Sequence, residues 1–223
     1  MNTNKFYDFF RPDMVTERIH IIGCGAIGSL VADTLARMGL TKITLYDFDT
    51  VEAHNIANQI YTEDDIGKPK VTALSKRLLA INPDMEEDLF VQPSGYQNQS
   101  LSGYVFLCVD NIDLRRAIVE KYQYNMFIKA MFDFRMRLTD AQHFAANWDD
   151  PKAVQSLLNS MQFTREEARE STPVSACNLT LSVIPTVWMI VSAGVANFMN
   201  FAKGAGYKKI IYVDAFKPSI EAY

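Results

Sequence analysis

The chain carries at residues 18–28 the stretch R-I-H-I-I-G-C-G-A-I-G, which decides its fold. Its β-branched run predicts a strand over residues 18–22. Gly23 then allows a tight turn, Gly25 lets a ligand approach the backbone, and Gly28 lets the next helix pack on the sheet. That helix, opening near Ala26, directs its unpaired N–H groups at bound phosphate. A second strand-like run ends in Asp47, whose carboxylate suits a ribose hydroxyl. The pattern predicts a nucleotide-binding βαβ unit.

Alternating strand-like and helix-like runs extend through the first 130 residues. They predict an α/β fold with a Rossmann-like, doubly wound and mostly parallel sheet, and a few antiparallel strands in the C-terminal half. The expected strands are 18–22, 42–46, 88–92, 104–109, 126–130, 141–145 and 209–213, and the expected helices are 26–38, 69–81 and 112–122. We expect a single domain over residues 1–223, with an N-terminal arm at 1–17 and a crossover segment at 147–176. The crossover segment reads as a solvated helical surface or as a mobile cover above the site.

Composition and charge narrow the class of protein. The net charge of −4 provides no basic field for nucleic acid. The first seventeen residues lack the continuous apolar run of a secretory signal. The three cysteines form no C-x-x-C pair, which fits a reducing compartment, so we expect a cytoplasmic protein.

Residues 177–202 contain no charged side chain and are long enough to cross a bilayer. Several polar residues interrupt this run, and its apolar positions recur at helical spacing. We therefore expect a helix buried in the core or in a subunit interface, and no membrane partner.

Four further blocks follow the glycines in order. They read D-F-D-T-V-E at 47–52, N-I-A-N-Q at 55–59, G-K-P-K at 67–70 and D-N-I-D-L-R at 110–115. The glycine motif alone would serve a dehydrogenase equally well, whereas five blocks in register are far more specific. Over residues 18–118 their order and spacing resemble the ThiF/MoeB family, the ATP-dependent enzymes that activate ubiquitin-like proteins and sulfur carriers.

The resemblance implies that ATP and Mg²⁺ bind here and that the chain adenylates the C-terminus of a carrier protein. Asp47 would bind the ribose, Lys70 the phosphates, and Asp110 the Mg²⁺ as a hard oxygen ligand. The remaining positions that it assigns to the nucleotide are Gly23, Gly25, Ile27, Gly28, Asp49, Asn55 and Gln59. The partner would be a ubiquitin-like or sulfur-carrier protein with a C-terminal glycine, and the enzyme a homodimer or heterodimer.

Ordinary structural roles compete with these assignments. Asp47 and Asp49 fit turn or cap acids, and Lys70 fits a surface helix. Asn111 can cap the helix that follows it. Arg115 fits a structural ion pair as well as a catalytic role.

One position departs from the family pattern. Where that pattern has an arginine for the triphosphate, this chain has Asn58, which is neutral and too short to replace a guanidinium group. Three replacements are open: Lys68, an approach by Arg135 or Arg137, or an arginine from a partner chain such as Arg11. The other outcome is a weakened or non-catalytic member of the family.

The cysteines separate into two groups. Cys24 and Cys108 read as small packing residues. Cys177 directly precedes the long apolar run, where a helix N-terminus favours a thiolate. By order along the chain, it corresponds to the position at which relatives form a thioester or persulfide, so it is a candidate nucleophile.

Three functions therefore remain open. The first is adenylation of a carrier protein, possible thioester transfer included. The second is a non-catalytic ThiF-like subunit that binds nucleotide or carrier in a heteromer. The third is an NAD-dependent oxidoreductase, which explains residues 23–47 but gives no role to the later blocks.

Overall fold

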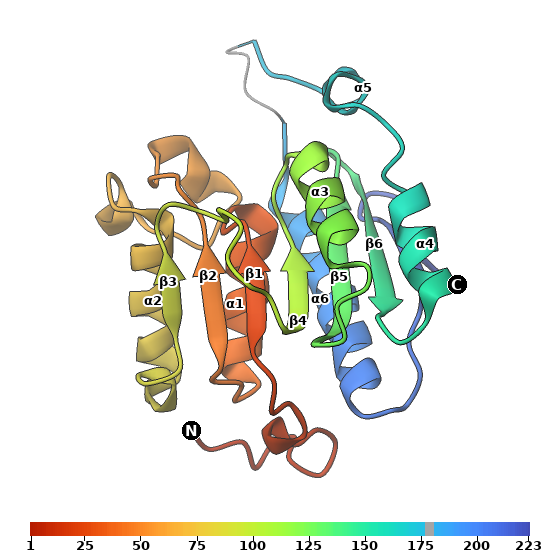
Figure 1. Ribbon diagram of the computed structural model, residues 1–223. Helices are drawn as coiled ribbons and strands as arrows, with labels where there is room; N and C mark the ends of the chain where they lie inside the picture. The colour runs from red at the N-terminus through yellow and green to blue at the C-terminus, as the bar shows by residue number, and fades with distance from the viewer. Residues whose placement is uncertain (177–180) are drawn as a thin grey trace.

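The strand ahead of the glycines lies in the middle of an eight-stranded sheet in a computed structural model, which describes residues 1–176 and 181–223 (Figure 1). The strand order is β3-β2-β1-β4-β5-β6-β7-β8, with β1 to β5 parallel and β6 to β8 antiparallel to their neighbours. The predicted fold class is confirmed. The strands are β1 (Ile19–Ile22), β2 (Ile43–Tyr46), β3 (Phe90–Gln92), β4 (Gly103–Leu107), β5 (Ile128–Met136), β6 (Asp140–Asn147), β7 (Ile210–Asp214) and β8 (Ser219–Ala222).

Helices cover both faces of this sheet (Figure 1). On one face, α1 packs between α2 and α6, and α6 also contacts β5, β6 and β7. On the other face, α3 packs beside α4, which lies on β6. Because both faces are covered, all four residues of β1 are buried, which explains its unbroken apolar character. The helices are α1 (Ala26–Arg37), α2 (Lys70–Ile81), α3 (Ile112–Tyr122), α4 (Pro151–Asn159), α5 (Arg165–Glu170) and α6 (Ile184–Ala202).

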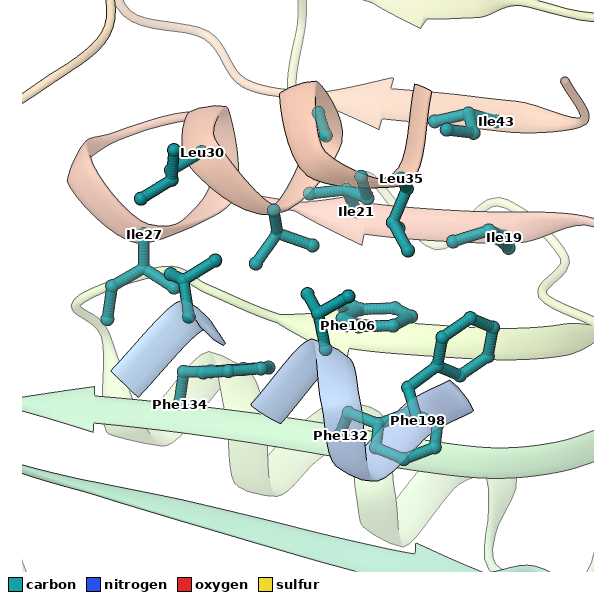
Figure 2. Packing of buried hydrophobic residues seen from close by; sticks show 14 of the residues in the cluster. Ile19, Ile21, Ile27, Leu30, Leu35, Ile43, Phe106, Phe132, Phe134 and Phe198 are labelled. Atoms are coloured by element: carbon teal, nitrogen blue, oxygen red, sulfur yellow. The ribbon is translucent and has the colours of Figure 1, made fainter. Parts of the chain in front are cut away.

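Aromatic rings join α6 to the centre of the sheet. Phe106 of β4 stacks on Phe132 of β5 with ring centroids 5.0 Å apart. Phe198 of α6 meets the two rings edge-on at 5.3 and 5.4 Å (Figure 2). By length and composition alone α6 could cross a membrane. Its buried residues nevertheless pack on the sheet, so the predicted core helix is confirmed and begins at Ile184.

Two regions differ from the sequence expectations. Strand β5 runs to Met136, well past residue 130, because the charged Asp133 and Arg135 that interrupt its apolar pattern are paired inside the protein. Residues 151–159 form α4, whose buried face contacts β6 and is more than a solvated surface. The edge strand β8, whose four residues are all exposed, carries no buried pattern and was not predicted.

The start of α1 depends on the absence of a side chain at residue 28. A Cβ there would lie 1.8 Å from the carbonyl oxygen of Gly23 and 3.1 Å from the Cβ of Cys108. At residue 25, in contrast, a Cβ would meet nothing within 4 Å. Gly28 therefore lies in close packing and Gly25 faces open space, as the sequence predicts for each of them.

This difference predicts opposite effects of two alanine substitutions. We expect Gly28→Ala to lower the free energy of unfolding by ~2 kcal/mol or more, because backbone must move to admit the new Cβ. We expect Gly25→Ala, at the N-cap of α1, to cost less than ~1 kcal/mol. Urea denaturation of the two variants measures both values, and equal losses would contradict the close contact at residue 28.

Candidate active site

The glycine loop lies at the carboxyl end of β1, directly ahead of α1. Gly23 has φ +94°, and a Cβ there would come within 2.8 Å of the backbone of Cys108 and Val109. The loop therefore passes against the residues that follow β4. Its open side at Gly25 faces the cavity described below, where α1 presents its N-terminus.

Asp47, which follows β2, is tied to this loop. One carboxylate oxygen accepts the backbone N–H of Cys24 at 2.6 Å, and the other accepts that of Asp49 at 2.8 Å. Burial raises the pKa of the Asp47 carboxyl, although these hydrogen bonds act in the opposite direction. The carboxylate thus fixes the loop and keeps acceptor capacity for a ligand hydroxyl.

A cavity of about 380 Å³ opens at the carboxyl ends of β1, β2 and β4. This is where open α/β sheets bind ligands. The residues predicted for the site that line it are Gly23, Gly25, Ile27, Asp47, Asp49, Gln59, Lys70 and Asp110, joined by Asn58 and Arg115. Gly28 and Asn55 do not line it: Gly28 packs under the loop, and Asn55 is buried nearby.

Lys70 is the first residue of α2, and its ammonium group lies 2.9 Å from Asp49. Its side chain is only 8% exposed, whereas that of Asp49 is 51% exposed. The surface-lysine alternative is therefore wrong. A ligand phosphate would compete with Asp49 for the same cation.

Residues 53–59 include one residue that stabilises the local fold and two that line the cavity. The side-chain oxygen of Asn55 accepts the N–H of Glu52 at 2.9 Å and closes a cap on the short 3₁₀ helix Ala53–Ala57. Asn58 and Gln59 both line the cavity. The side-chain oxygen of Gln59 is buried and has no hydrogen-bond partner among the described residues. The side-chain oxygen of Gln59 can therefore accept a hydrogen bond from a ligand, whereas that of Asn55 already accepts one from Glu52.

Asp110 follows β4, which lies on the other side of β1 from β2. Its residue is exposed, and its carboxylate forms no hydrogen bond or ion pair with any described residue. Its neighbour Asn111 caps α3 by accepting the N–H groups of Asp113 and Leu114, as expected. The cap and the open carboxylate thus belong to two adjacent residues.

No group of three or more His, Cys, Asp or Glu side chains that could hold a metal occurs in residues 1–176 and 181–223. A Mg²⁺ ion needs only one or two carboxylates when substrate phosphates and water supply the other oxygens. Asp110 fits that mode of binding.

The other cations considered for the site are engaged elsewhere. Arg115 lines the cavity but is 6% exposed and pairs with the buried Asp133. Arg135 pairs with the same carboxylate at 2.6 Å, and Arg137 pairs with Asp140 at 2.8 Å. Lys68 lies 3.7 Å from Asp65, and Arg11 belongs to the arm at the opposite end of the sheet (Figure 1). Among the described lining residues, Lys70 is therefore the cation whose partner, Asp49, also lines the cavity.

Burial disfavours the thiolate form of Cys24 and Cys108, the described cysteines. Burial raises the pKa of the Cys108 thiol to about 12 and raises that of Cys24 well above its usual range. Cys177, the candidate nucleophile, lies outside the described residues.

Several cavity residues were not found from the sequence. Tyr46, Phe48 and Tyr96 form an aromatic wall beside Asp47, while Phe134 and Ser182 come from the second half of the chain. Tyr46 and Phe48 flank Asp47 in sequence, which is a usable signal. Tyr96 and Ser182 belong to no motif, because only the tertiary fold brings them to this edge.

One further contact within the site was also missed. Tyr61 is 4% exposed, and its hydroxyl donates to the carbonyl of Cys24 at 2.7 Å. It links the glycine loop to the segment that leads into Lys70.

Known proteins resemble this chain in sequence and in fold. Ubiquitin-like modifier-activating enzyme 5 of Drosophila virilis is 34% identical over 134 residues, and that of Drosophila mojavensis is 35% identical over 134 residues. Each match covers 53% of this chain. The chain spans about a third of those relatives' length: 32% and 33%.

Solved structures share the fold over almost the whole chain. The crystal structure of PaaA has a TM-score of 0.68 at 17% identity and covers 95% of this chain and 65% of its own. E. coli MccB with ATP has a TM-score of 0.66 at 18% identity and covers 95% and 64%. E. coli MccB with MccA reaches 0.70 at 18% identity, covering 95% and 65%.

The family model described as "ThiF family" matches residues 6–210, a range that contains every described cavity residue. Together with the doubly wound sheet and the ordered motif residues around one cavity, this match shows that the chain belongs to the ThiF family.

Proposed function

We propose that this chain uses ATP to adenylate the C-terminal carboxylate of a ubiquitin-like or sulfur-carrier protein. A carboxylate oxygen of the carrier attacks the α-phosphorus, the bond from that phosphorus to the bridging oxygen breaks, and pyrophosphate leaves. The product is an acyl-adenylate. Such a step requires positioning and stabilisation of phosphate charge and little proton transfer.

One observation carries the proposal: Asp110, whose carboxylate has no partner among the described residues, the cation of Lys70 and the open backbone at Gly25 line the same cavity. The helix N-terminus and Lys70 suit phosphate oxygens, and Asp110 would hold a metal that neutralises phosphate charge. A nicotinamide dinucleotide would use the glycines and Asp47 but not Lys70 or Asp110.

Mg²⁺, when bound by Asp110, would supply charge neutralisation at the phosphates. The chain's own side chains would bind and orient the nucleotide. Asp47 orients the ribose, while Lys70 turns from Asp49 toward the phosphates. Gln59, whose side-chain oxygen has no partner in residues 1–176 and 181–223, offers that oxygen to a ligand donor.

The shortage of cations supports an arginine supplied by a partner chain. Asp47, Asp49 and Asp110 line the cavity with three carboxylates, and the lining cations are Lys70, which pairs with Asp49, and Arg115, which pairs with Asp133. Asn58 adds no charge at the position where the family pattern has arginine. Arg11 has an exposed side chain in the N-terminal arm and is the candidate donor across a dimer.

The neutral Asn58 in the cavity wall also favours a second candidate, a non-catalytic subunit that binds nucleotide or carrier in a heteromer. The two functions share nucleotide binding and differ in turnover. We extend the first proposal to a cytoplasmic enzyme with one domain that works as a dimer.

Removal of the Asp110 carboxylate tests the adenylation proposal. We expect Asp110→Asn to lower ATP–pyrophosphate exchange by ~100-fold, because it removes the anionic ligand that would hold Mg²⁺, and with it the cation that would neutralise phosphate charge in the transition state. The substrate is a small carrier protein that ends in two glycines. Asp113→Asn, at an exposed acid in the first turn of α3, serves as the control and should keep the exchange rate. ATP binding without exchange in the native chain would support the non-catalytic subunit.

Restoring the family arginine tests the explanation of Asn58. We expect Asn58→Arg to raise the exchange rate by a factor of ten or more, since a guanidinium group at the phosphates stabilises the transition state by ~2 kcal/mol. Asn58→Gln, which adds length but no charge, should leave the rate unchanged. A lower rate in the arginine variant would show that the neutral residue is required.

A nucleophilic Cys177 predicts a covalent product. With ATP and the carrier we expect a conjugate that thiols cleave and that is absent in Cys177→Ala, because a thiolate would attack the acyl-adenylate and release AMP. Cys24→Ala provides the buried-thiol control. Non-reducing electrophoresis detects the conjugate, and exchange activity without any conjugate would reject this role.

A further inference from the structure

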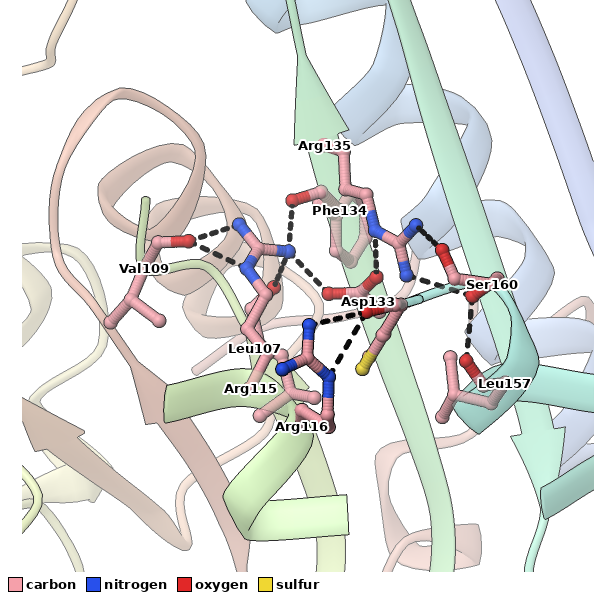
Figure 3. A network of polar contacts seen from close by, with 10 residues as sticks. Leu107, Val109, Arg115, Arg116, Asp133, Phe134, Arg135, Leu157 and Ser160 are labelled. Atoms are coloured by element: carbon pink, nitrogen blue, oxygen red, sulfur yellow. Dashed lines mark hydrogen bonds and ion pairs between the residues drawn. The ribbon is translucent and has the colours of Figure 1, made fainter. Parts of the chain in front are cut away.

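Asp133 of β5 lies between two arginines in the interior. Its carboxylate is 0% exposed, one oxygen pairs with Arg115, and the other lies 2.6 Å from Nε of Arg135 (Figure 3). We call these three residues the Asp133 cluster. A buried carboxylate requires such partners, but a single arginine would already balance its charge.

Arg115 connects the cluster to the active site. Its guanidinium donates to the carbonyls of Leu107, Val109 and Phe134. Leu107 ends β4, Val109 directly precedes Asp110, and Phe134 lines the cavity. Arg115 therefore fixes the backbone from which the Asp110 carboxylate projects.

Arg135 connects the cluster to the end of α4. Its two terminal nitrogens donate to the carbonyl and the hydroxyl of Ser160, at 2.7 and 2.8 Å. The same guanidinium packs over the rings of Phe144 and Phe163, 4.3 and 5.6 Å from their centroids. Residue 160 begins the run that leads through α5 above the carboxyl ends of the strands (Figure 1).

A neighbouring arginine holds the next turn of this run. Arg116 donates to the carbonyls of Met161 and Phe163 (Figure 3 shows part of this contact). It belongs to the same helix as Arg115. Helix α3 and strand β5 thus both tie residues 160–163 to the backbone at Asp110.

We propose that Arg135 is a positioning residue that couples residues 160–163 to the Asp110 backbone through Asp133 and Arg115. The effect of this coupling on catalysis rests on the function proposed above. The coupling itself is a property of the ligand-free chain. Coupling is reciprocal. A ligand that fixes Asp110 also steadies the start of the segment above the site, and the reverse holds.

Arg135→Met is the informative variant. It leaves Asp133 and Arg115 as a balanced pair, and the methionine keeps apolar contact with Phe144, so the fold should persist. Arg137→Met is the matched control. Arg137 directly follows β5, and the only described partner of its side chain is Asp140. Asp133→Asn would instead leave two buried cations without a counter-charge.

Amide hydrogen exchange without ligand tests the coupling directly. In Arg135→Met we expect exchange to accelerate about tenfold both at residues 161–163 and at residues 108–115, with no change in Arg137→Met. Thermal unfolding establishes that each variant is folded. Acceleration confined to residues 161–163, or none at all, would overturn the proposal.

A second arm uses Mg²⁺ and ATP. In the native chain we expect nucleotide to slow exchange at residues 161–163. In Arg135→Met this effect should disappear while ATP affinity stays within about threefold. Retained slowing would overturn the coupling. If the native chain binds no ATP, the proposed function fails, and the ligand-free arm still decides the role of Arg135.

Discussion

The close contact between Gly28 and the carbonyl of Gly23 is the constraint on which the site depends. It lets α1 begin directly beneath the loop that ends β1, with no side chain between them. The N-terminus of α1 then faces the cavity, and the backbone N–H of Cys24 in the loop donates to the carboxylate of Asp47. Helix α1 also separates α2 from α6, so its position determines how that whole layer covers the sheet.

Charge balance is the second physical feature of the site. Three carboxylates line the cavity, while its buried arginine, Arg115, is already paired with Asp133. A polyphosphate alone would be repelled, whereas a polyphosphate with a divalent cation is accommodated by Asp110 and Lys70. The arginines that could compensate for Asn58 within the described chain instead hold backbone carbonyls and carboxylates. These guanidinium groups therefore stabilise the backbone around the site.

Local constraints explain what could be predicted from the sequence. The tight turn at Gly23, the close packing at Gly28 and the acid after β2 each have a recognisable cause in residue type and spacing, and they identified the fold and the position of the cavity. Asn55 shows the limit of that reasoning, because the same motif position closes a helical cap outside the cavity. Tyr96, Phe134 and Ser182 could not be found, since long-range strand order alone brings them to the cavity.

The second half of the chain was harder to predict for a related reason. Asp133 and Arg135 interrupt the apolar pattern of β5, and only their mutual pairing inside the protein makes a buried strand possible there. The amphipathic face of α4 is short and lies among polar residues, so its contact with β6 is visible only in the fold. The nucleophilic role of Cys177 stays a prediction.

We propose that this cavity binds ATP for transfer of its adenylyl group. Calorimetric titration of the full chain with ATP in the presence of Mg²⁺, and separately with NAD⁺, distinguishes the two nucleotides. We expect saturable binding of one ATP per chain that requires Mg²⁺ for full affinity, with no heat from NAD⁺. Tight binding of NAD⁺, or the absence of ATP binding, would contradict it.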